Sequence, residues 1–186
     1  MIAKIVREYV RNECDSSKNA FGPAFFEQHL SVVVAYAKRL GGILGADLEI
    51  IELAGWLHDI SAVQDIAALP RHPALSAEIA RKMLREKDYS AERIERVAKC
   101  IVSHSAPVQI GSGAVEEVCV SNADAMSQIV KPAYWLYYVF RVRQFSFAEG
   151  RDWLRQRVES NWVALIQPAK DIVENEYRQV REVLTL

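Results

Sequence analysis

An all-α fold is what this sequence predicts, and three observations support the prediction. Apolar residues recur at spacings of three and four along most of the 186 residues, which is the period of an amphipathic helix. Glycine, proline and N-capping residues interrupt the pattern at helix-length intervals. The segment richest in β-branched and aromatic residues, 133–147, has neither strand alternation nor the turn residues of a hairpin. The chain is therefore expected to be helical nearly throughout.

The first part of the chain contains three predicted helices. An N-terminal helix carries a single apolar stripe, and a loop containing Gly22 and Pro23 follows it. A second helix starts at Pro23 and is expected to stop at the glycine pair 41–42. Asp47 is the expected N-cap of a third helix, which runs to His58. The stripe of the first helix consists of Ile2, Ile5, Val6, Tyr9 and Val10.

The middle of the chain contains three more predicted helices. A loop over residues 61–71 precedes the fourth helix, and Pro73 suits the first turn of that helix. Ser90 opens the fifth helix, which ends at His104. The sixth helix covers residues 114–130. These three segments complete the predicted core of the fold.

The C-terminal part of the chain is richer in aromatic residues. Beyond Pro132 we expect a helix, followed by two more, and Pro168 either starts or kinks the last of them. No internal repeat is present. We expect one domain spanning residues 1–186, with a core over about 23–130 and a C-terminal helical extension over 131–186.

Composition and charge narrow the class of protein. Hydrophobic residues make up 51% and charged residues 25% of the chain, and the formal net charge is -1, so no basic field favours nucleic acid or a membrane surface. The N-terminus lacks the unbroken apolar stretch of a signal peptide, and no segment is long enough to span a bilayer. A cytoplasmic location is expected, because the cysteines are odd in number and form no CxxC pair. They are Cys14, Cys100 and Cys119.

Imidazole and carboxylate side chains lie at the expected ends and faces of several helices. Nitrogen and oxygen ligands of this kind suit divalent transition metals. Adjacent residues of a helix point about 100° apart, so the neighbours His58 and Asp59 can bind one ion only at a helix end, where the carboxylate can turn inward. The candidate metal ligands are His29, His58, Asp59, His72, His104 and Asp124.

These residues resemble the motifs of the HD superfamily of metal-dependent phosphohydrolases, an all-α family named for its His-Asp dyad. His29 in "FFEQHLSVVVAYAKRL", the dyad in "LAGWLHDIS" and Asp124 in "SNADAM" match the family pattern. His72 in "RHPALSAEIARKML" and His104 in "IERVAKCIVSHS" resemble a subset that binds two metal ions. That subset includes enzymes that split diadenosine tetraphosphate and enzymes that hydrolyse cyclic dinucleotides. The resemblance spans roughly residues 23–130.

The resemblance implies a cofactor of one or two divalent ions, chosen among Fe, Mn, Ni, Co and Zn. It also implies hydrolysis of a phosphate mono- or diester bond in a small, nucleotide-like substrate through a metal-activated water, with Asp59 at the centre of catalysis. Two alternatives stay open, a mononuclear nucleotidase and a non-catalytic sensor that binds metal and nucleotide. With two ions, the first would be held by His29, His58, Asp59 and Asp124, and the second by Asp59, His72 and His104.

The sequence departs from the family pattern immediately after the dyad. Many relatives continue as "HDIGK", whereas this chain reads "HDISA", with Ala62 at the position of the lysine. Arg71 and Lys131 are the candidates to contact a phosphate in place of that lysine, because each is near a predicted ligand or the end of the core.

Three other features have a simpler interpretation. Asp65 is expected to be a solvated loop residue rather than a catalytic carboxylate. The aromatic run 134–140 is typical of a helix core or a homodimer interface more than of a nucleobase pocket. The arginines within 141–157 alternate with acidic residues and are expected to form a solvated face. Substrate choice is expected to depend on the loops 61–71 and 105–113 and on the C-terminal helices.

Overall fold

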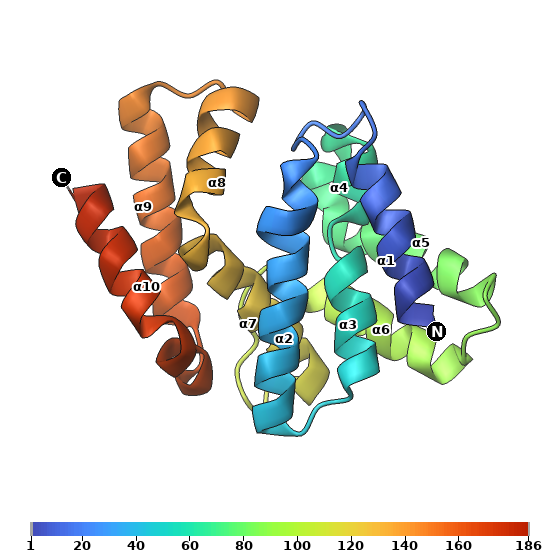
Figure 1. Ribbon diagram of the computed structural model, residues 1–186. Coiled ribbons are helices and arrows are strands. Elements are labelled where there is room, and N and C mark those ends of the chain that lie inside the picture. The colour runs from blue at the N-terminus through green and yellow to red at the C-terminus, as the bar shows by residue number, and fades with distance from the viewer. Residues whose placement is uncertain (1, 186) are drawn as a thin grey trace.

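The computed structural model describes residues 2–185, and every regular element among them is helical (Figure 1). The all-α prediction is therefore confirmed. In chain order the elements are α1 (Ile2–Cys14), η1 (Phe26–Leu30), α2 (Ser31–Leu44), α3 (Leu48–Leu57), α4 (Ile60–Gln64), η2 (Ile66–Arg71), α5 (His72–Arg85), α6 (Ala91–Ser103), α7 (Val115–Val130), α8 (Pro132–Tyr137), η3 (Tyr138–Val142), α9 (Phe147–Ala164) and α10 (Gln167–Thr185).

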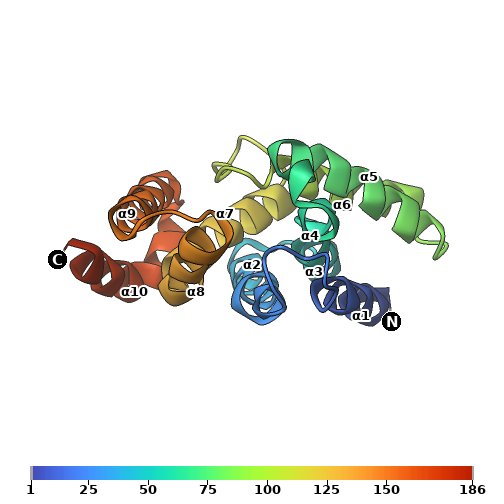
Figure 2. The same cartoon turned by 90° about the horizontal axis from the view of Figure 1, so that it is seen from above.

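Helix α7 lies at the centre of the molecule. Residues 118–129 of this helix are all buried, because α2, α3 and α6 pack on one side of it and α9 and α10 on the other. Figure 1 shows α8, α9 and α10 grouped beside α7 and α2, with α1, α3, α4, α5 and α6 beyond them. The view from above shows the same order (Figure 2). The polar residues of α7 therefore need partners inside the protein.

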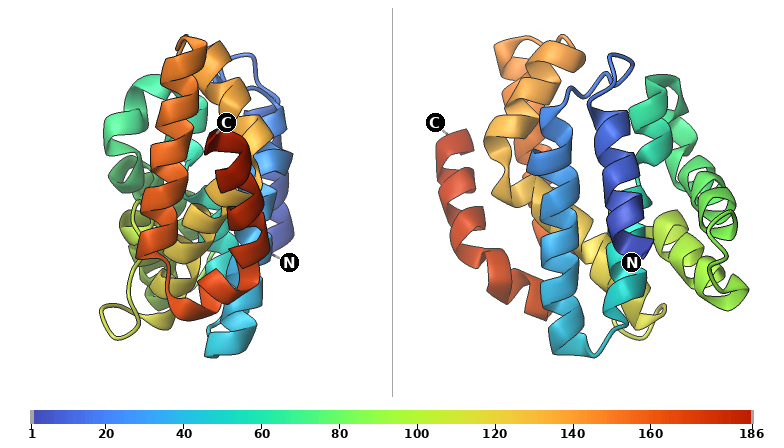
Figure 3. Two further views of the ribbon diagram at one scale, coloured as in Figure 1. Left: turned by 90° about the vertical axis from the view of Figure 1, so that its left-hand side faces the viewer. Right: turned by 45° about the vertical axis from the view of Figure 1, so that its right-hand side comes forward.

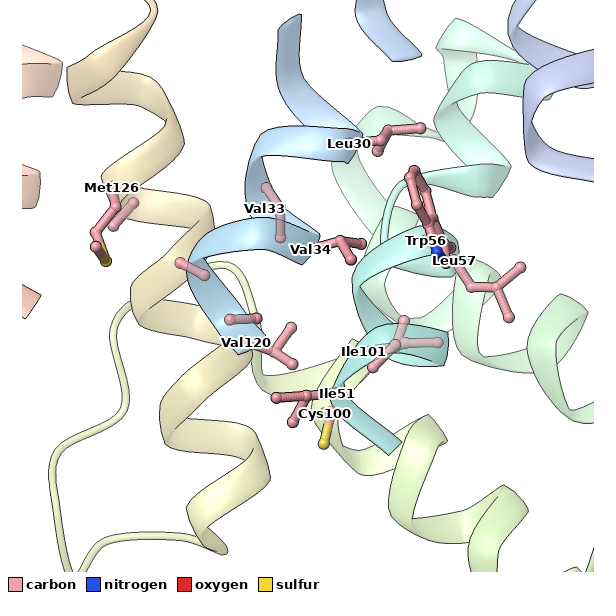
Figure 4. Packing of buried hydrophobic residues seen from close by; sticks show 14 of the residues in the cluster. Leu30, Val33, Val34, Ile51, Trp56, Leu57, Cys100, Ile101, Val120 and Met126 are labelled. Carbon is pink, nitrogen blue, oxygen red and sulfur yellow. The ribbon is translucent and has the colours of Figure 1, made fainter. Parts of the chain in front are cut away.

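One apolar core joins these helices. Figure 4 shows side chains of α2, α3, α6 and α7 packed together, with Val34 next to Trp56 and Ile51 near Cys100. The C-terminal helices extend this core, and α9 and α10 lie side by side at the edge away from α1 (Figure 3). None of the described helices has both the length and the apolar composition needed to cross a membrane.

Helix α2 runs past the glycine pair at which the sequence predicted its end. A Cβ atom on Gly41 would lie only 2.6 Å from Cδ1 of Ile51, so this glycine lets α2 pack closely against α3. The helix ends instead at Gly45, whose φ of 76° is the left-handed conformation that glycine adopts without strain. The prediction of a stop at residues 41–42 was wrong, because glycine there serves helix packing.

The segment 61–71 is not the open loop that the sequence predicted. It forms the short helix α4 and the 3-10 helix η2, because residues 60–63 are buried in the core although the segment is too short to be a stable helix alone. Asp65 is exposed and caps η2 by accepting a hydrogen bond from the backbone N–H of Ala67 at 2.9 Å.

Other predicted boundaries agree with the structure. The Asp47 side chain accepts hydrogen bonds from the backbone N–H groups of Glu49 and Ile50 and so caps α3. Pro168 is the second residue of α10 and starts that helix rather than kinking it. The aromatic segment is helical, but it changes from α8 to the π-helix η3, and Gln144 at φ 55° ends it before α9. This turn brings α9 back against α8 and α7.

Candidate metal centre

Six side chains from six separate helical elements converge beside α7. Three of the histidines lie where a helix ends or begins, because the chain in this region is divided into several short helices. His29 lies in η1, His58 follows α3, Asp59 precedes α4, His72 begins α5, His104 follows α6, and Asp124 lies in the middle of α7.

The histidines form two pairs on either side of one carboxylate. His29 Nε2 lies 3.0 Å from His58 Nε2, and His72 Nε2 lies 2.9 Å from His104 Nε2. Asp59 Oδ2 lies 3.3 Å from His29 Nε2 and 3.4 Å from His58 Nε2. The other oxygen, Asp59 Oδ1, lies 3.2 Å from His72 Nε2 and 3.6 Å from His104 Nε2. Each oxygen of Asp59 therefore faces a different histidine pair.

The position of Asp59 depends on the break between α3 and α4. Its backbone, at φ -107° and ψ 7°, departs from helical geometry, and the side chain turns inward between the two histidine pairs. The next helix begins at once, because the carbonyl of Asp59 accepts from the backbone N–H groups of Ala62 and Val63, each at 3.0 Å. Because the helix breaks at Asp59, the side chains of His58 and Asp59 can both face the same candidate metal position.

Asp124 adds a second carboxylate to the first histidine pair. Its Oδ1 lies 3.4 Å from His29 Nε2 and 3.8 Å from His58 Nε2. Its Oδ2 accepts a hydrogen bond of 3.2 Å from the side-chain amide of Gln128, one turn later on α7. That bond holds the carboxylate with Oδ1 toward the histidines. The first group thus has four candidate ligands, and the second has three.

The outer nitrogen of each imidazole is held by an acceptor. For three histidines, Nδ1 faces the carbonyl of the residue three positions earlier, and a carbonyl can only accept, so Nδ1 carries the proton. For His29, Nδ1 lies 3.0 Å from Ser127 Oγ, whose own proton is donated to the carbonyl of Asp124 at 2.7 Å, so Ser127 accepts. The carbonyl pairs are His58 with Gly55 at 2.9 Å, His72 with Leu69 at 2.7 Å and His104 with Ile101 at 2.5 Å.

This arrangement fits divalent cations. With Nδ1 protonated, every Nε2 has a lone pair, and those lone pairs face one another and two carboxylates within a few ångströms. These lone pairs and carboxylate oxygens repel one another unless cations or additional protons lie between them. The side chains His29, His58 and Asp59 form one group that could hold an ion, and Asp59, His72 and His104 form another. Nitrogen and oxygen donors in this ratio are those of Zn, Fe, Mn, Ni or Co sites.

Burial and charge perturb the acid-base properties of these groups. Burial by itself lowers the pKa of His58, but the carboxylates of Asp59 and Asp124 outweigh it and raise that pKa to about 9. Burial would raise the pKa of Asp59, yet the positive charge that His58 carries when protonated and the close contacts with the other imidazoles hold it well below its usual range. Burial lowers the pKa of His72. The two carboxylates therefore favour positive charge beside His58, whereas burial opposes a proton on His72.

Two residues proposed from the sequence as phosphate contacts do not line the cavity at the metal centre. Lys131 ends α7 and borders a separate hollow formed with α2 and Glu176. Arg71 is exposed at the end of η2 and is not among the residues that line the cavity at the centre. Lys131 is therefore away from the histidine cluster, whereas Arg71 directly precedes the candidate ligand His72 but does not line the cavity. Ala62 is fully buried in the core, so its position offers no contact to a ligand either.

Five of the six residues, all except His58, border a cavity of about 330 Å³ that the sequence interpretation did not anticipate. Its remaining wall is aromatic and basic. Among its residues, Trp135 packs its edge against the His29 ring at 5.4 Å, and Phe25 stacks on the other side of that imidazole at 4.7 Å. The other residues of the wall include Phe21, Ser105, Gln128, Tyr138, Arg143, Trp153 and Arg157. The prediction that the arginines within 141–157 form only a solvated face was therefore incomplete.

Fold and site together define an all-helical protein with a buried His/Asp centre suited to divalent metals. The chain belongs to the HD domain family, whose model matches residues 26–129. The fold is similar to that of a predicted HD superfamily hydrolase from an uncultured Thermotogales bacterium, with a TM-score of 0.59 and 20% sequence identity over 96% of this chain and 91% of that one. No curated protein matches the sequence significantly.

Replacing Ser127 with alanine is expected to weaken metal binding. The substitution removes the acceptor that orients the His29 ring, and loss of such a supporting group costs about 10–100-fold in metal affinity. Titration against a competing chelator measures the change. Ser121→Ala is the matched control, because Ser121 is equally buried on α7 but hydrogen-bonds the backbone of Val108 instead. Equal affinities in the two variants would contradict the role of Ser127.

Proposed function

We propose that this protein hydrolyses a phosphate mono- or diester bond of a small, nucleotide-like substrate with the help of two divalent transition-metal ions. Membership of the HD family supports a metal-dependent phosphohydrolase. The observation that carries the two-ion proposal is the placement of Asp59 between two histidine pairs, with one carboxylate oxygen toward each. His29, His58, Asp59 and Asp124 would hold the first ion, and Asp59, His72 and His104 the second.

The protein's own residues would mainly position the ions and exclude bulk water from the centre. Ions bound at such a centre supply an activated water and neutralise charge on the phosphoryl oxygens. Asp59 sets the spacing of the two groups through its shared carboxylate. The backbone carbonyls and Ser127 keep every Nε2 lone pair directed inward. The aromatic side chains around His29 keep bulk water from one side of the centre.

The direct test measures metal content and hydrolysis on the same sample. Elemental analysis of the purified protein is expected to find bound transition metal, and a panel of nucleotides, dinucleotides, sugar phosphates and generic phosphoesters is expected to include a substrate when Mn²⁺, Co²⁺, Ni²⁺ or Fe²⁺ is supplied. Absence of bound metal together with absence of hydrolysis would sink the proposal. The departure at Ala62 favours one other role, a sensor, which would show a ligand that raises the melting temperature and stays intact.

His104→Ala separates a two-ion centre from a one-ion centre. The ligand atom of His104, Nε2, faces the second group, since it lies near His72 and Asp59 Oδ1, and the ring packs edge-on against His58 of the first group at 4.8 Å. The variant is therefore expected to bind one equivalent of metal where the unmodified protein binds two, and its hydrolysis is expected to fall at least about tenfold. Elemental analysis gives the stoichiometry. A value of one for both proteins would support the mononuclear alternative, in which only the first group binds an ion.

A further inference from the structure

Part of the cavity wall comes from residues that lie beyond the region matched by the HD family. The family match ends at residue 129, whereas Trp135, Tyr138, Arg143, Trp153 and Arg157 come from α8, η3, the turn after η3, and α9. Figure 1 shows these elements standing beside α2 and α7 on the C-terminal side of the molecule. The metal centre therefore lies within the matched region, and the C-terminal helices supply a further part of the cavity wall.

Two guanidinium groups in this wall have no acidic partner. No carboxylate among residues 2–185 lies within ion-pair distance of Arg143 or Arg157. The nearby arginines of α9 do have an acidic partner, because Arg151 and Arg155 both pair with Asp152. Two positive charges that border one cavity and are not neutralised within the described protein favour an anion between them and the metal ligands.

Arg157 is also linked to the metal centre. Its Nε donates to the side-chain oxygen of Gln128, and the amide nitrogen of Gln128 donates to Asp124 Oδ2 at 3.2 Å. The same oxygen of Gln128 accepts from Asn161 at 3.2 Å. Arg157 is thus oriented by its Nε alone, and its two terminal nitrogens have no hydrogen-bond partner among the described residues. A single buried amide separates the guanidinium from a candidate metal ligand.

The aromatic residues form the third part of this wall. Tyr138 packs against Trp135 at 5.6 Å and Trp153 at 6.0 Å, and Trp135 in turn contacts the ring of His29. Trp153 is only half-buried and lines the cavity. Aromatic side chains of this kind bind flat or apolar groups. The cavity volume of about 330 Å³ is at the lower end of the range of ligand cavities.

We propose that Arg143 and Arg157 bind the anionic group of the substrate, and that they and the aromatic wall select a small phosphomonoester with a single flat or apolar group. This inference rests on the proposed function and narrows its substrate class. A phosphomonoester carries up to two negative charges, which matches the two arginines that line the cavity of the metal centre. A dinucleotide with two bases would have to extend out of a cavity of about 330 Å³ into solvent. The C-terminal helices, not the family core, would then determine which phosphate ester is accepted.

The test measures binding of inorganic phosphate to the full-length, metal-loaded protein by calorimetry. Arg143→Gln and Arg157→Gln are each expected to weaken phosphate binding by about tenfold or more, because each removes a charged hydrogen-bond donor. Arg143→Lys and Arg157→Lys are expected to restore only part of the affinity. Lysine keeps the positive charge but cannot make the two parallel hydrogen bonds that a planar guanidinium makes to a phosphate. Elemental analysis is expected to show unchanged metal content in all four variants.

Arg155→Gln is the matched control. Arg155 lies on α9 like Arg157 and is exposed like Arg143 and Arg157, but it pairs with Asp152 and does not line the cavity. Phosphate affinity in this variant is expected to stay within about twofold of the unmodified protein. If the Arg143 and Arg157 variants bind phosphate as tightly as Arg155→Gln does, the inference is wrong.

Turnover distinguishes failure of the inference from failure of the proposed function. In the arginine variants, KM for an aromatic phosphomonoester is expected to rise more than kcat falls, because the guanidiniums hold the substrate while the ions and their ligands remain in place. Dinucleotides hydrolysed as efficiently as small phosphomonoesters would overturn the size argument and leave the proposed function intact. Phosphate binding that depends on the arginines, without hydrolysis of any ester, would overturn the proposed function and leave the anion site intact.

Discussion

Asp59→Asn is expected to remove metal from both groups and to lower hydrolysis more than about a hundredfold. Asp59 is the residue that both groups share, with Oδ2 near His29 and His58 and Oδ1 near the second pair. An asparagine amide has no negative charge and presents one oxygen instead of two. Loss of a group that only supports a ligand already costs up to about a hundredfold, so loss of the shared ligand is expected to cost more.

Elemental analysis and steady-state kinetics on the same preparation measure this effect. Asp65→Asn is the matched control, because Asp65 lies six positions further along, is exposed and caps η2, and asparagine caps a helix as well as aspartate does. The control is expected to keep its metal and its activity. Two ions retained by Asp59→Asn would show that this carboxylate does not join the groups.

Removal of metal is expected to lower the melting temperature by about 5–10 °C for each ion lost. A ligand present at a hundred times its Kd stabilises the folded state by about 2.7 kcal/mol, and 1 kcal/mol corresponds to about 2–4 °C for a chain of this size. The physical cause is the convergence of four Nε2 lone pairs and two carboxylates from six helical elements, which repel one another when no cation is bound.

Differential scanning calorimetry before and after treatment with a chelator measures the shift. Restoring the metal is expected to restore the melting temperature. The Asp59→Asn protein serves as the control, because it is expected to bind no metal and should melt at the same temperature with or without the chelator. A protein that contains metal and whose melting temperature does not change on its removal would contradict the stabilising role of the centre.

Much of the fold could be predicted from the sequence because its signals are local. The spacing of apolar residues, the Asp47 cap and Pro168 act within a few residues, and the structure agrees with each. The predictions failed where packing overrides local preference. Gly41 continues a helix because α3 lies too close for a side chain, and residues 60–64 form a helix because the core buries them.

The site could be predicted in part for a similar reason. The six imidazole and carboxylate side chains stand in motifs with fixed spacing at helix ends, so the order of residues alone indicated that they belong together, and the structure brings all six together. Arg71 and Lys131 were proposed because they are near ligands in the chain. Although they are close to the ligands in sequence, neither residue lines the cavity in the structure.

By itself, the sequence determined most of the helices, the family and the set of side chains that converge. Only the tertiary structure decided that one carboxylate stands between two histidine pairs, and that Arg143 and Arg157 rather than Arg71 and Lys131 border the same cavity. Helix periodicity is a property of neighbouring residues. The return of α9 against α7 depends on a turn after η3 and on buried contacts between distant segments, which no local pattern specifies.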